Sequence, residues 1–248
     1  LIIFISMIEH KIIPPFSHEW YIYNLITILV IFFIIFIGRS ISDLHKKQLS
    51  YIIAGLFMFE FVFMEFYNIY KGLWSMQDSL PLHLCAIMWF LCIYLLLKNK
   101  KWVFEMILFI GMPGGIHSLL TPELTHGDSL LHKIDFFVGH GGLVLIPFYA
   151  IFVMKMWPRT DGWWKSFLKL QLLVLTIGLF NVIAGSNYMY LMQTPIADNP
   201  LIPSDNSFFG QWPYYILIFE LAVLGHAILI NIPFMIKNKI NKQRNLIS

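Results

Sequence analysis

The sequence predicts an all-α integral membrane protein with seven transmembrane helices. Of the 248 residues, 58% are hydrophobic and only 12% are charged, and the mean hydropathy is +0.70, well above that of a water-soluble domain. The apolar residues fall into seven runs of roughly 18 to 22 residues, the length of helix that crosses a hydrocarbon core of about 30 Å. The alternating pattern of a membrane barrel is absent, and helices satisfy their own backbone polar groups in lipid.

The spans follow one another through short connections that leave no room for a separate soluble domain, so we expect residues 1–248 to form a single transmembrane domain. Residues 1–19 are expected to lie on the outer surface as an interfacial segment, because their apolar stretch is too short to span and no cleavage site follows it. Residues 236–248 are expected to form a basic cytoplasmic tail. The expected spans are approximately Trp20–Ile37, Ser50–Tyr70, Pro81–Leu97, Trp102–Leu120, Asp135–Val153, Ser166–Asn187 and Pro213–Met235.

The Lys and Arg residues indicate how the helices are oriented. Of these 17 residues, 13 lie in the first, third and fifth connections and in the C-terminal tail. Because cytoplasmic loops carry the excess of Lys and Arg, we expect the N-terminus outside the cell and the C-terminus in the cytoplasm. The net charge of +3 is then explained by the orientation of the helices in the membrane. The sequence has no basic face on a soluble domain, so we expect no nucleic-acid partner. We expect a multi-pass protein of the cell membrane, with its oligomeric state left open.

Two reactive side chains are expected at matched depth in the outer half of the membrane. The third and fifth spans both run inward from the outer surface. Cys85 lies about four residues below the expected start of the third span, roughly 6 Å at helical rise, and His140 lies about five residues below the start of the fifth, roughly 7.5 Å. Polar groups at this depth are costly unless they are paired or face a cavity, so each is a candidate functional residue.

Further polar side chains are expected in the same outer layer. The fourth span is interrupted at Gly111-Met112-Pro113-Gly114-Gly115, a pattern that kinks or unwinds a helix. The inner halves of the spans are strongly apolar. This favours a pocket that opens outward and is closed on the cytoplasmic side, rather than a pathway through the membrane. The additional members of the layer are His83, Glu65, His117, Asn187 and Glu220.

Each of these residues also has a purely structural interpretation. Cys85 could be a small buried apolar side chain, and His83 could simply cap a helix. Asn187 could join two helices by a hydrogen bond. Glu65 and Glu220 are harder to explain in this way, because an unpaired carboxylate in hydrocarbon costs several kcal/mol, but protonation or pairing would suffice.

Several segments resemble one family of membrane proteins. Leu80-Pro81-Leu82-His83-Leu84-Cys85, the Gly111–Gly115 segment followed by Leu120-Thr121-Pro122, and Phe136-Phe137-Val138-Gly139-His140 are similar to segments of the bacterial YwaF-like membrane proteins, which are related to the eukaryotic transmembrane protein 164 family. The resemblance covers nearly all seven spans and implies a seven-helix protein. The eukaryotic branch is described as cysteine-centred acyltransferases that act on phospholipid acyl chains. By this resemblance, Cys85 is the nucleophile and His140 its general base.

The residues themselves are compatible with that chemistry. An imidazole can take the proton of a thiol and later return it to a leaving alcohol, and Glu220 or Glu65 could orient the imidazole as the third member of a triad. The candidate substrate-binding groups are His83, Glu65, His117 and Asn187, of which the two histidines and Asn187 could also donate to an oxyanion. We therefore expect a lipid acyltransferase or acyl hydrolase that acts at the outer leaflet on a phospholipid or lysophospholipid, with no metal or other cofactor.

Two other functions remain open. A zinc-dependent intramembrane hydrolase would use His83, His117 and His140, assembled across helices because no local HxxxH or HExxH spacing is present. A non-enzymatic transporter or receptor would bind a solute in the same polar layer, although no internal repeat supports transport.

Overall fold

All seven expected spans are helical. The computed structural model describes residues 11–195 and 207–247. Within these residues, six helices are long and apolar enough to cross a membrane, and a further apolar helix, α3, is shorter. The prediction of an all-α polytopic membrane protein is therefore confirmed. The spans are α1 (His18–Ser40), α2 (Asp43–Tyr70), α3 (Leu84–Lys98), the continuous segment α4–η1–α5 (Lys101–Leu120), α6 (Leu130–Phe152), α7 (Gly162–Ala184) and α8 (Tyr214–Ile247).

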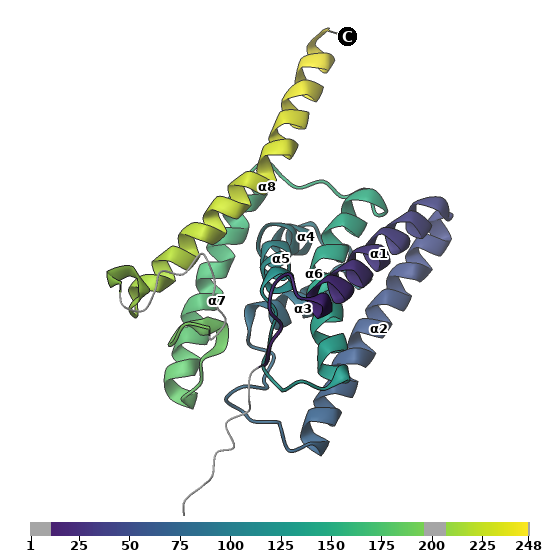
Figure 1. The fold of residues 1–248 in the computed structure, drawn as a ribbon. Helices are drawn as coiled ribbons and strands as arrows, with labels where there is room; N and C mark the ends of the chain where they lie inside the picture. The colour runs from purple at the N-terminus through teal and green to yellow at the C-terminus, as the bar shows by residue number, and fades with distance from the viewer. Residues whose placement is uncertain (1–10, 196–206, 248) are drawn as a thin grey trace, which may run out of the picture.

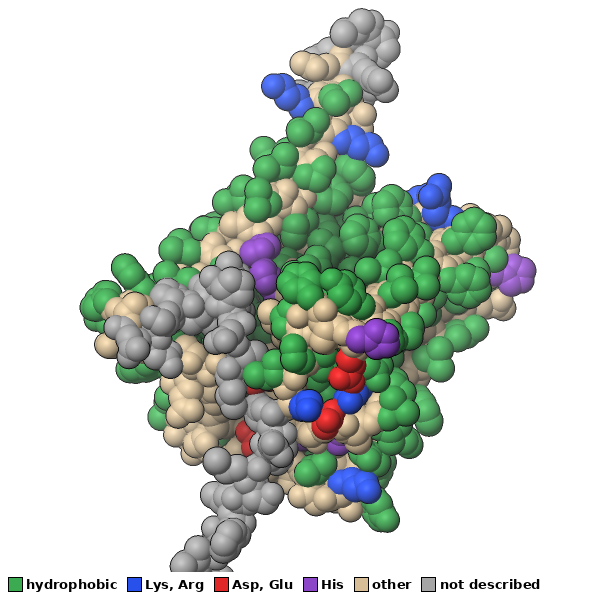
Figure 2. Space-filling view, in the orientation of Figure 1, with side chains coloured by type: hydrophobic (Ala, Val, Ile, Leu, Met, Phe, Trp, Pro, Cys, Tyr) green, Lys and Arg blue, Asp and Glu red, His purple; other side chains and the backbone are tan. Residues whose placement is uncertain are grey.

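The fourth span forms the centre of the bundle. In the 18-residue apolar stretch of this span, 72% of the residues are buried inside the protein. The share in the same length of helix is 11% in α1 and 17% in α7 and α8. The helices α3 and α6 pack next to it, α1 and α2 lie on one side, and α7 and α8 lie on the other (Figure 1). The outer helices expose many large hydrophobic side chains (Figure 2), as helices facing lipid must.

The third span begins later than predicted. The sequence suggested a start at Pro81, but α3 begins at Leu84, with His83 as its N-cap residue. Its 15 residues extend about 22 Å, less than the roughly 30 Å of a hydrocarbon core. In the irregular chain ahead of α3, backbone polar groups find hydrogen-bond partners inside the protein. The Leu80 N–H, for example, donates to the Tyr188 hydroxyl at 2.9 Å. Non-helical backbone is tolerated at membrane depth where protein surrounds it or where it lines a cavity.

The expected interruption of the fourth span is a π-helical turn in a helix that remains continuous. The helix α4 (Lys101–Met106) passes into the π-helix η1 (Ile107–Gly111), and α5 (Met112–Leu120) follows with Pro113 in its first turn. Proline has no N–H to donate to the preceding turn, and a π-turn accommodates that loss without unwinding the helix. All residues of η1 are buried, so the altered turn lies within protein.

Two glycines in this span allow its neighbours to approach closely. A Cβ atom at Gly115 would lie 2.8 Å from the His140 carbonyl oxygen, so α5 touches the backbone of α6. A Cβ atom at Gly111 would lie 3.1 Å from the Met88 side chain on α3. The fourth span therefore holds α3 and α6 at short range, which brings the Cys85 and His140 segments to the same end of the bundle.

A short sheet closes that end of the molecule. The strand β1 (Lys11–Ile12) pairs in antiparallel fashion with β2 (Glu123–Leu124) in the connection between α5 and α6. Lys133 then links the start of α1 to this connection, because its Nζ lies 2.7 Å from both Glu19 and Asp128. Residues 1–10 of the expected interfacial segment lie outside the described residues. The expected basic tail is a helical continuation of α8, which projects beyond the other helices (Figure 1).

A buried ion pair anchors the connection between α6 and α7 at the opposite end. The Glu105 side chain on α4 is only 1% exposed, and it accepts hydrogen bonds from the Arg159 backbone N–H at 2.8 Å and from Nε at 2.9 Å. A Cβ atom at Gly162 would lie 2.7 Å from the Glu105 carboxyl carbon, so α7 starts directly against this carboxylate. The pair thus positions α7 relative to the central span.

Replacing Arg159 with alanine should destabilise the protein strongly. The change leaves the Glu105 carboxylate buried without its cation, and removing one partner of a buried pair typically costs about 3–5 kcal/mol. The unfolding temperature of the purified protein in detergent measures the effect. Arg39→Ala, which removes an exposed arginine at the end of α1, is the matched control and should leave that temperature nearly unchanged. Equal shifts for the two variants would contradict the structural role of the pair.

Single cysteines can test the orientation expected from the basic residues. In a chain whose native cysteines are both replaced by alanine, Lys71→Cys should react with a membrane-impermeant maleimide on intact cells, and Lys100→Cys should not. Both lysines are exposed and lie in connections at opposite ends of the bundle. The positive-inside rule places the Lys100 end in the cytoplasm. Labelling of Lys100→Cys but not of Lys71→Cys would show that the protein has the opposite orientation.

Candidate active site

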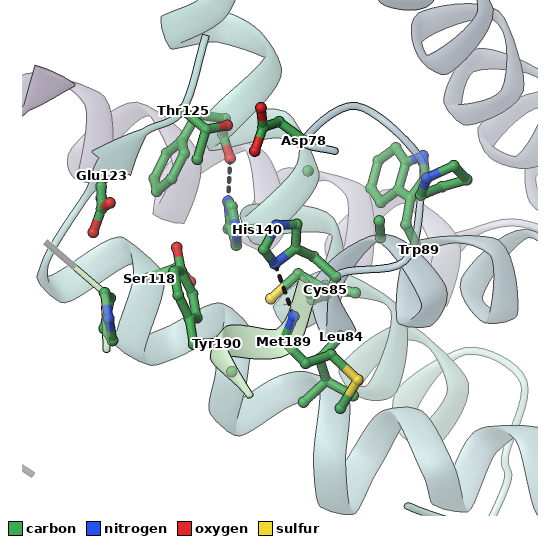
Figure 3. A pocket seen from close by; sticks show the side chains of 18 of the residues that line it. Asp78, Leu84, Cys85, Trp89, Ser118, Glu123, Thr125, His140, Met189 and Tyr190 are labelled. Carbon is green, nitrogen blue, oxygen red and sulfur yellow. Dashed lines mark hydrogen bonds between the residues drawn. The ribbon is translucent and has the colours of Figure 1, made fainter. Parts of the chain in front are cut away.

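A cavity of about 500 Å³ lies among the helices at the end of the bundle where α3 begins. This volume falls within the range of roughly 300–1,000 Å³ that is usual for ligand pockets. Its walls come from α2, α3, α5, α6, α7 and α8 and from the chain that follows α7 (Figure 3). The residues from the expected polar layer that line it are Cys85, His140, Glu220, His83, Glu65 and His117.

Cys85 lies in the first turn of α3, with its sulfur at the cavity wall (Figure 3). The side of α5 that faces Cys85 carries small and polar residues. A Cβ atom at Gly114 would lie 3.6 Å from the Cys85 Sγ, and the Ser118 side chain lies near the thiol. The other cysteine, Cys92, is 0% exposed and belongs to the hydrophobic core. Of the two thiols, only that of Cys85 therefore faces the cavity.

His140 lies on α6, where its ring is held in one orientation. The Nδ1 atom is 2.8 Å from the Phe136 carbonyl oxygen, one helical turn earlier, and the Phe136 ring packs on the imidazole at 4.2 Å between centroids. A carbonyl only accepts, so Nδ1 carries the proton and Nε2 keeps its lone pair. Within residues 11–195 and 207–247 no hydrogen bond joins His140 to the Cys85 thiol.

The two expected carboxylates have partners other than His140. Glu220 on α8 accepts a hydrogen bond from the Gln171 amide at 2.6 Å, and Glu65 on α2 accepts one from the Trp74 indole at 2.8 Å. The structure therefore does not assemble a triad in which Glu220 orients the imidazole. The backbone carbonyl of Phe136 orients it instead, because it lies on the same helix at hydrogen-bonding range.

His83 and Asn187 both contact the chain that follows α7. The Nδ1 atom of His83 accepts a hydrogen bond from the Met189 N–H at 3.3 Å, and the His83 ring packs against Tyr188 and Tyr190. Asn187 is not among the residues that line the cavity. Its side-chain oxygen accepts hydrogen bonds from two backbone N–H groups a few residues later, so Asn187 shapes this segment rather than the cavity wall.

His117 joins the central span to α8. Its Nε2 lies 3.1 Å from Nε2 of His226, whose Nδ1 lies 2.6 Å from the Ala222 carbonyl. Because His226 donates through Nδ1, its Nε2 accepts, and His117 is the donor of the shared hydrogen bond. Within the described part of the chain, no three His, Cys, Asp or Glu side chains are grouped so that they could hold a metal ion. His83, His117 and His140 thus do not converge on one ligand position.

Sequence reasoning did not assign a site role to four further residues of the cavity wall. Glu60 and Asp135 both line the cavity with their carboxyl groups near each other, and the Glu60 Oε1 atom is buried without a hydrogen-bond partner among the described residues. Ser118 and Tyr190 face the region of Cys85 (Figure 3). Asp135 directly precedes the Phe-Phe-x-x-His segment, so its position in the sequence offered a signal. Ser and Tyr are common in such proteins, so their positions carried no signal.

Comparison with known proteins gives one match. The family model described as the TMEM164 family matches residues 14–231, which extend from the turn before α1 into α8. No curated protein and no solved structure matches the chain. The matched region includes the first six spans, the first part of α8 and all the residues placed around the cavity. Since the model covers far more than half of the sequence, this chain belongs to the TMEM164 family.

Proposed function

We propose that this protein is a membrane-embedded lipid acyltransferase or acyl hydrolase in which Cys85 is the nucleophile and His140 the general base. The observation that carries the proposal is that both side chains line the same cavity, with the imidazole held as the tautomer whose Nε2 can accept a proton. No hydrogen bond joins them within the described residues, and such contacts often tighten only when substrate is bound.

The covalent step follows from these two groups. The Cys85 thiol gives its proton to His140 Nε2 while Sγ attacks the carbonyl carbon of a lipid ester. The carbonyl electron pair moves to oxygen and then returns, breaking the bond to the glycerol oxygen. His140 delivers the proton to that oxygen, so a lysophospholipid alcohol leaves and the acyl group remains on sulfur as a thioester.

The second half of the reaction decides between the two activities. His140 removes a proton from an incoming hydroxyl group, which attacks the thioester carbonyl and restores the free thiol. A lysophospholipid hydroxyl gives a new phospholipid, and water gives a free fatty acid. A cavity near the end of a short helix suits a lipid ester, because ester carbonyls lie where hydrocarbon meets the headgroups.

Trapping of the thioester tests the nucleophile. Purified protein incubated with an acyl-labelled phospholipid should acquire label that hydroxylamine removes, and Cys85→Ala should acquire none. Cys92→Ala is the matched control and should still be labelled, since Cys92 lies about 10 Å further along α3 and is fully buried. Undiminished lipid turnover by Cys85→Ala would falsify the covalent mechanism and favour a metal-dependent hydrolase or a solute-binding protein.

Two additions to this assay separate the alternatives. Chelation should leave the labelling intact, because the thiol mechanism uses no metal; loss of labelling and its return with added zinc would support the zinc alternative. Supplying a lysophospholipid should move the label into a phospholipid if the protein is a transferase. Release of labelled fatty acid with no such transfer would identify a hydrolase.

Removal of the base should slow acylation while leaving the thiol in place. His140→Ala should reduce the rate of thioester formation about 10²- to 10⁴-fold, the usual range for loss of a general base. The residual rate should rise with pH, because without the imidazole the reaction depends on thiolate formed by the solvent. Single-turnover labelling at several pH values measures both effects. A wild-type rate in His140→Ala would exclude His140 as the base.

A further inference from the structure

The chain that follows α7 adopts an unusual backbone at the cavity wall. Met189 has a φ of 59° and Tyr190 a φ of 53°, so two consecutive residues with side chains occupy the left-handed region. This conformation costs roughly 1–3 kcal/mol at each residue other than glycine, and it persists only where the surroundings enforce it. Such strain is concentrated at active sites and ligand clamps.

Hydrogen bonds on both sides enforce this conformation. The side-chain oxygen of Asn181, which is 1% exposed, accepts from the Tyr188 N–H at 2.9 Å, and its amide donates to the Tyr188 carbonyl at 2.8 Å. The Tyr215 hydroxyl on α8 donates to the Tyr190 carbonyl at 2.8 Å. Together with the bond from Met189 to His83, these contacts place the Tyr190 side chain on the cavity wall.

The hydroxyl groups of three tyrosines around this segment differ in their partners. The Tyr188 hydroxyl donates to the Met76 carbonyl, and the Tyr215 hydroxyl donates to a backbone carbonyl as well. Among residues 11–195 and 207–247, no hydrogen bond uses the Tyr190 hydroxyl. Its ring packs on His83 at 5.4 Å between centroids, and its hydroxyl lies within electrostatic range of the Cys85 thiol. Figure 3 shows Tyr190 and Cys85 in the same wall.

The Tyr190 hydroxyl is suited to donate rather than to ionise. Burial, together with the nearby Glu123 carboxylate, raises the pKa of Tyr190 above the usual value of a phenol, so the group keeps its proton at neutral pH. A neutral donor in the same cavity wall as the nucleophile, with no hydrogen-bond partner among the described residues, is the kind of group that can stabilise an oxyanion.

We propose that Tyr190 is a further catalytic residue, whose hydroxyl donates a hydrogen bond to the oxyanion formed when Cys85 attacks the lipid ester. This inference rests on the proposed function. As the carbonyl electron pair moves to oxygen, the phenol O–H binds the developing negative charge and keeps its own proton. When the intermediate collapses, the electron pair returns and the hydrogen bond weakens again. The strained backbone holds the donor in place before substrate arrives.

Tyr190→Phe tests this role in the full-length purified protein. The single-turnover rate of thioester formation should fall about 10²- to 10³-fold, as for the loss of one oxyanion donor, with little change in KM. Affinity for an acyl trifluoromethyl ketone, which forms a tetrahedral adduct with a thiol, should fall in parallel. Tyr214→Phe removes an exposed hydroxyl outside the cavity wall and is the matched control; it should react as the wild type does.

A second substitution separates catalysis from packing. Placing 4-aminophenylalanine at position 190 keeps a hydrogen-bond donor on a ring of similar size and should restore part of the lost rate. If the Tyr190→Phe protein labels as fast as Tyr214→Phe while Cys85→Ala remains unlabelled, the role of Tyr190 is overturned and the proposed function stands. If Cys85→Ala turns over lipid normally, both proposals fail. A loss of rate without weaker ketone binding or donor rescue would reduce Tyr190 to a structural residue.

Discussion

Backbone polar groups at membrane depth need partners within the protein, and this requirement shapes the end of the bundle that holds the cavity. The chain between α2 and α3 contains no helix, and the segment 185–195 after α7 contains only the short 3-10 helix η2 (Tyr188–Tyr190). The Tyr188 hydroxyl joins these two irregular segments, because it accepts from the Leu80 N–H and donates to the Met76 carbonyl. Asn181 satisfies both backbone groups of Tyr188 in turn. These bonds allow α3 to start late, and the cavity lies beside the shortened helix.

The cavity wall has an unusual balance of charge. Among the residues that the structure describes, its lining includes Glu and Asp side chains and several histidines but no Lys or Arg. Two of its carboxylates accept hydrogen bonds from neutral donors, Glu220 from the Gln171 amide and Glu65 from the Trp74 indole. Such pairing avoids the cost of an isolated charge in a water-poor environment. It also leaves the Nε2 lone pair of His140 available for proton transfer.

The central span explains how residues from distant parts of the chain meet. Gly115 permits backbone contact between α5 and α6, and Gly114 and Ser118 on the same helix face the thiol of Cys85 on α3. Substituting a larger residue at Gly115 would push α6 away, because an added Cβ atom would lie only 2.8 Å from the His140 carbonyl oxygen. Small residues commonly mark such close helix contacts in membrane proteins. The π-turn before Pro113 sets the rotation of this helix face.

The sequence by itself determined the membrane class and the seven helical segments, because hydropathy and the positions of charged residues act over local windows. It also predicted that Cys85 and His140 lie in one layer, and both line the cavity, but α3 begins at Leu84 and α6 at Leu130, so the depths counted from the expected span starts do not apply. Only the tertiary structure decided which groups pair. A helix turns by about 100° per residue, so its rotation against its neighbours cannot be deduced from depth alone. For that reason the sequence could not show that Glu220 faces Gln171, that the Phe136 carbonyl orients His140, or that a strained segment places Tyr190 in the same cavity wall as Cys85.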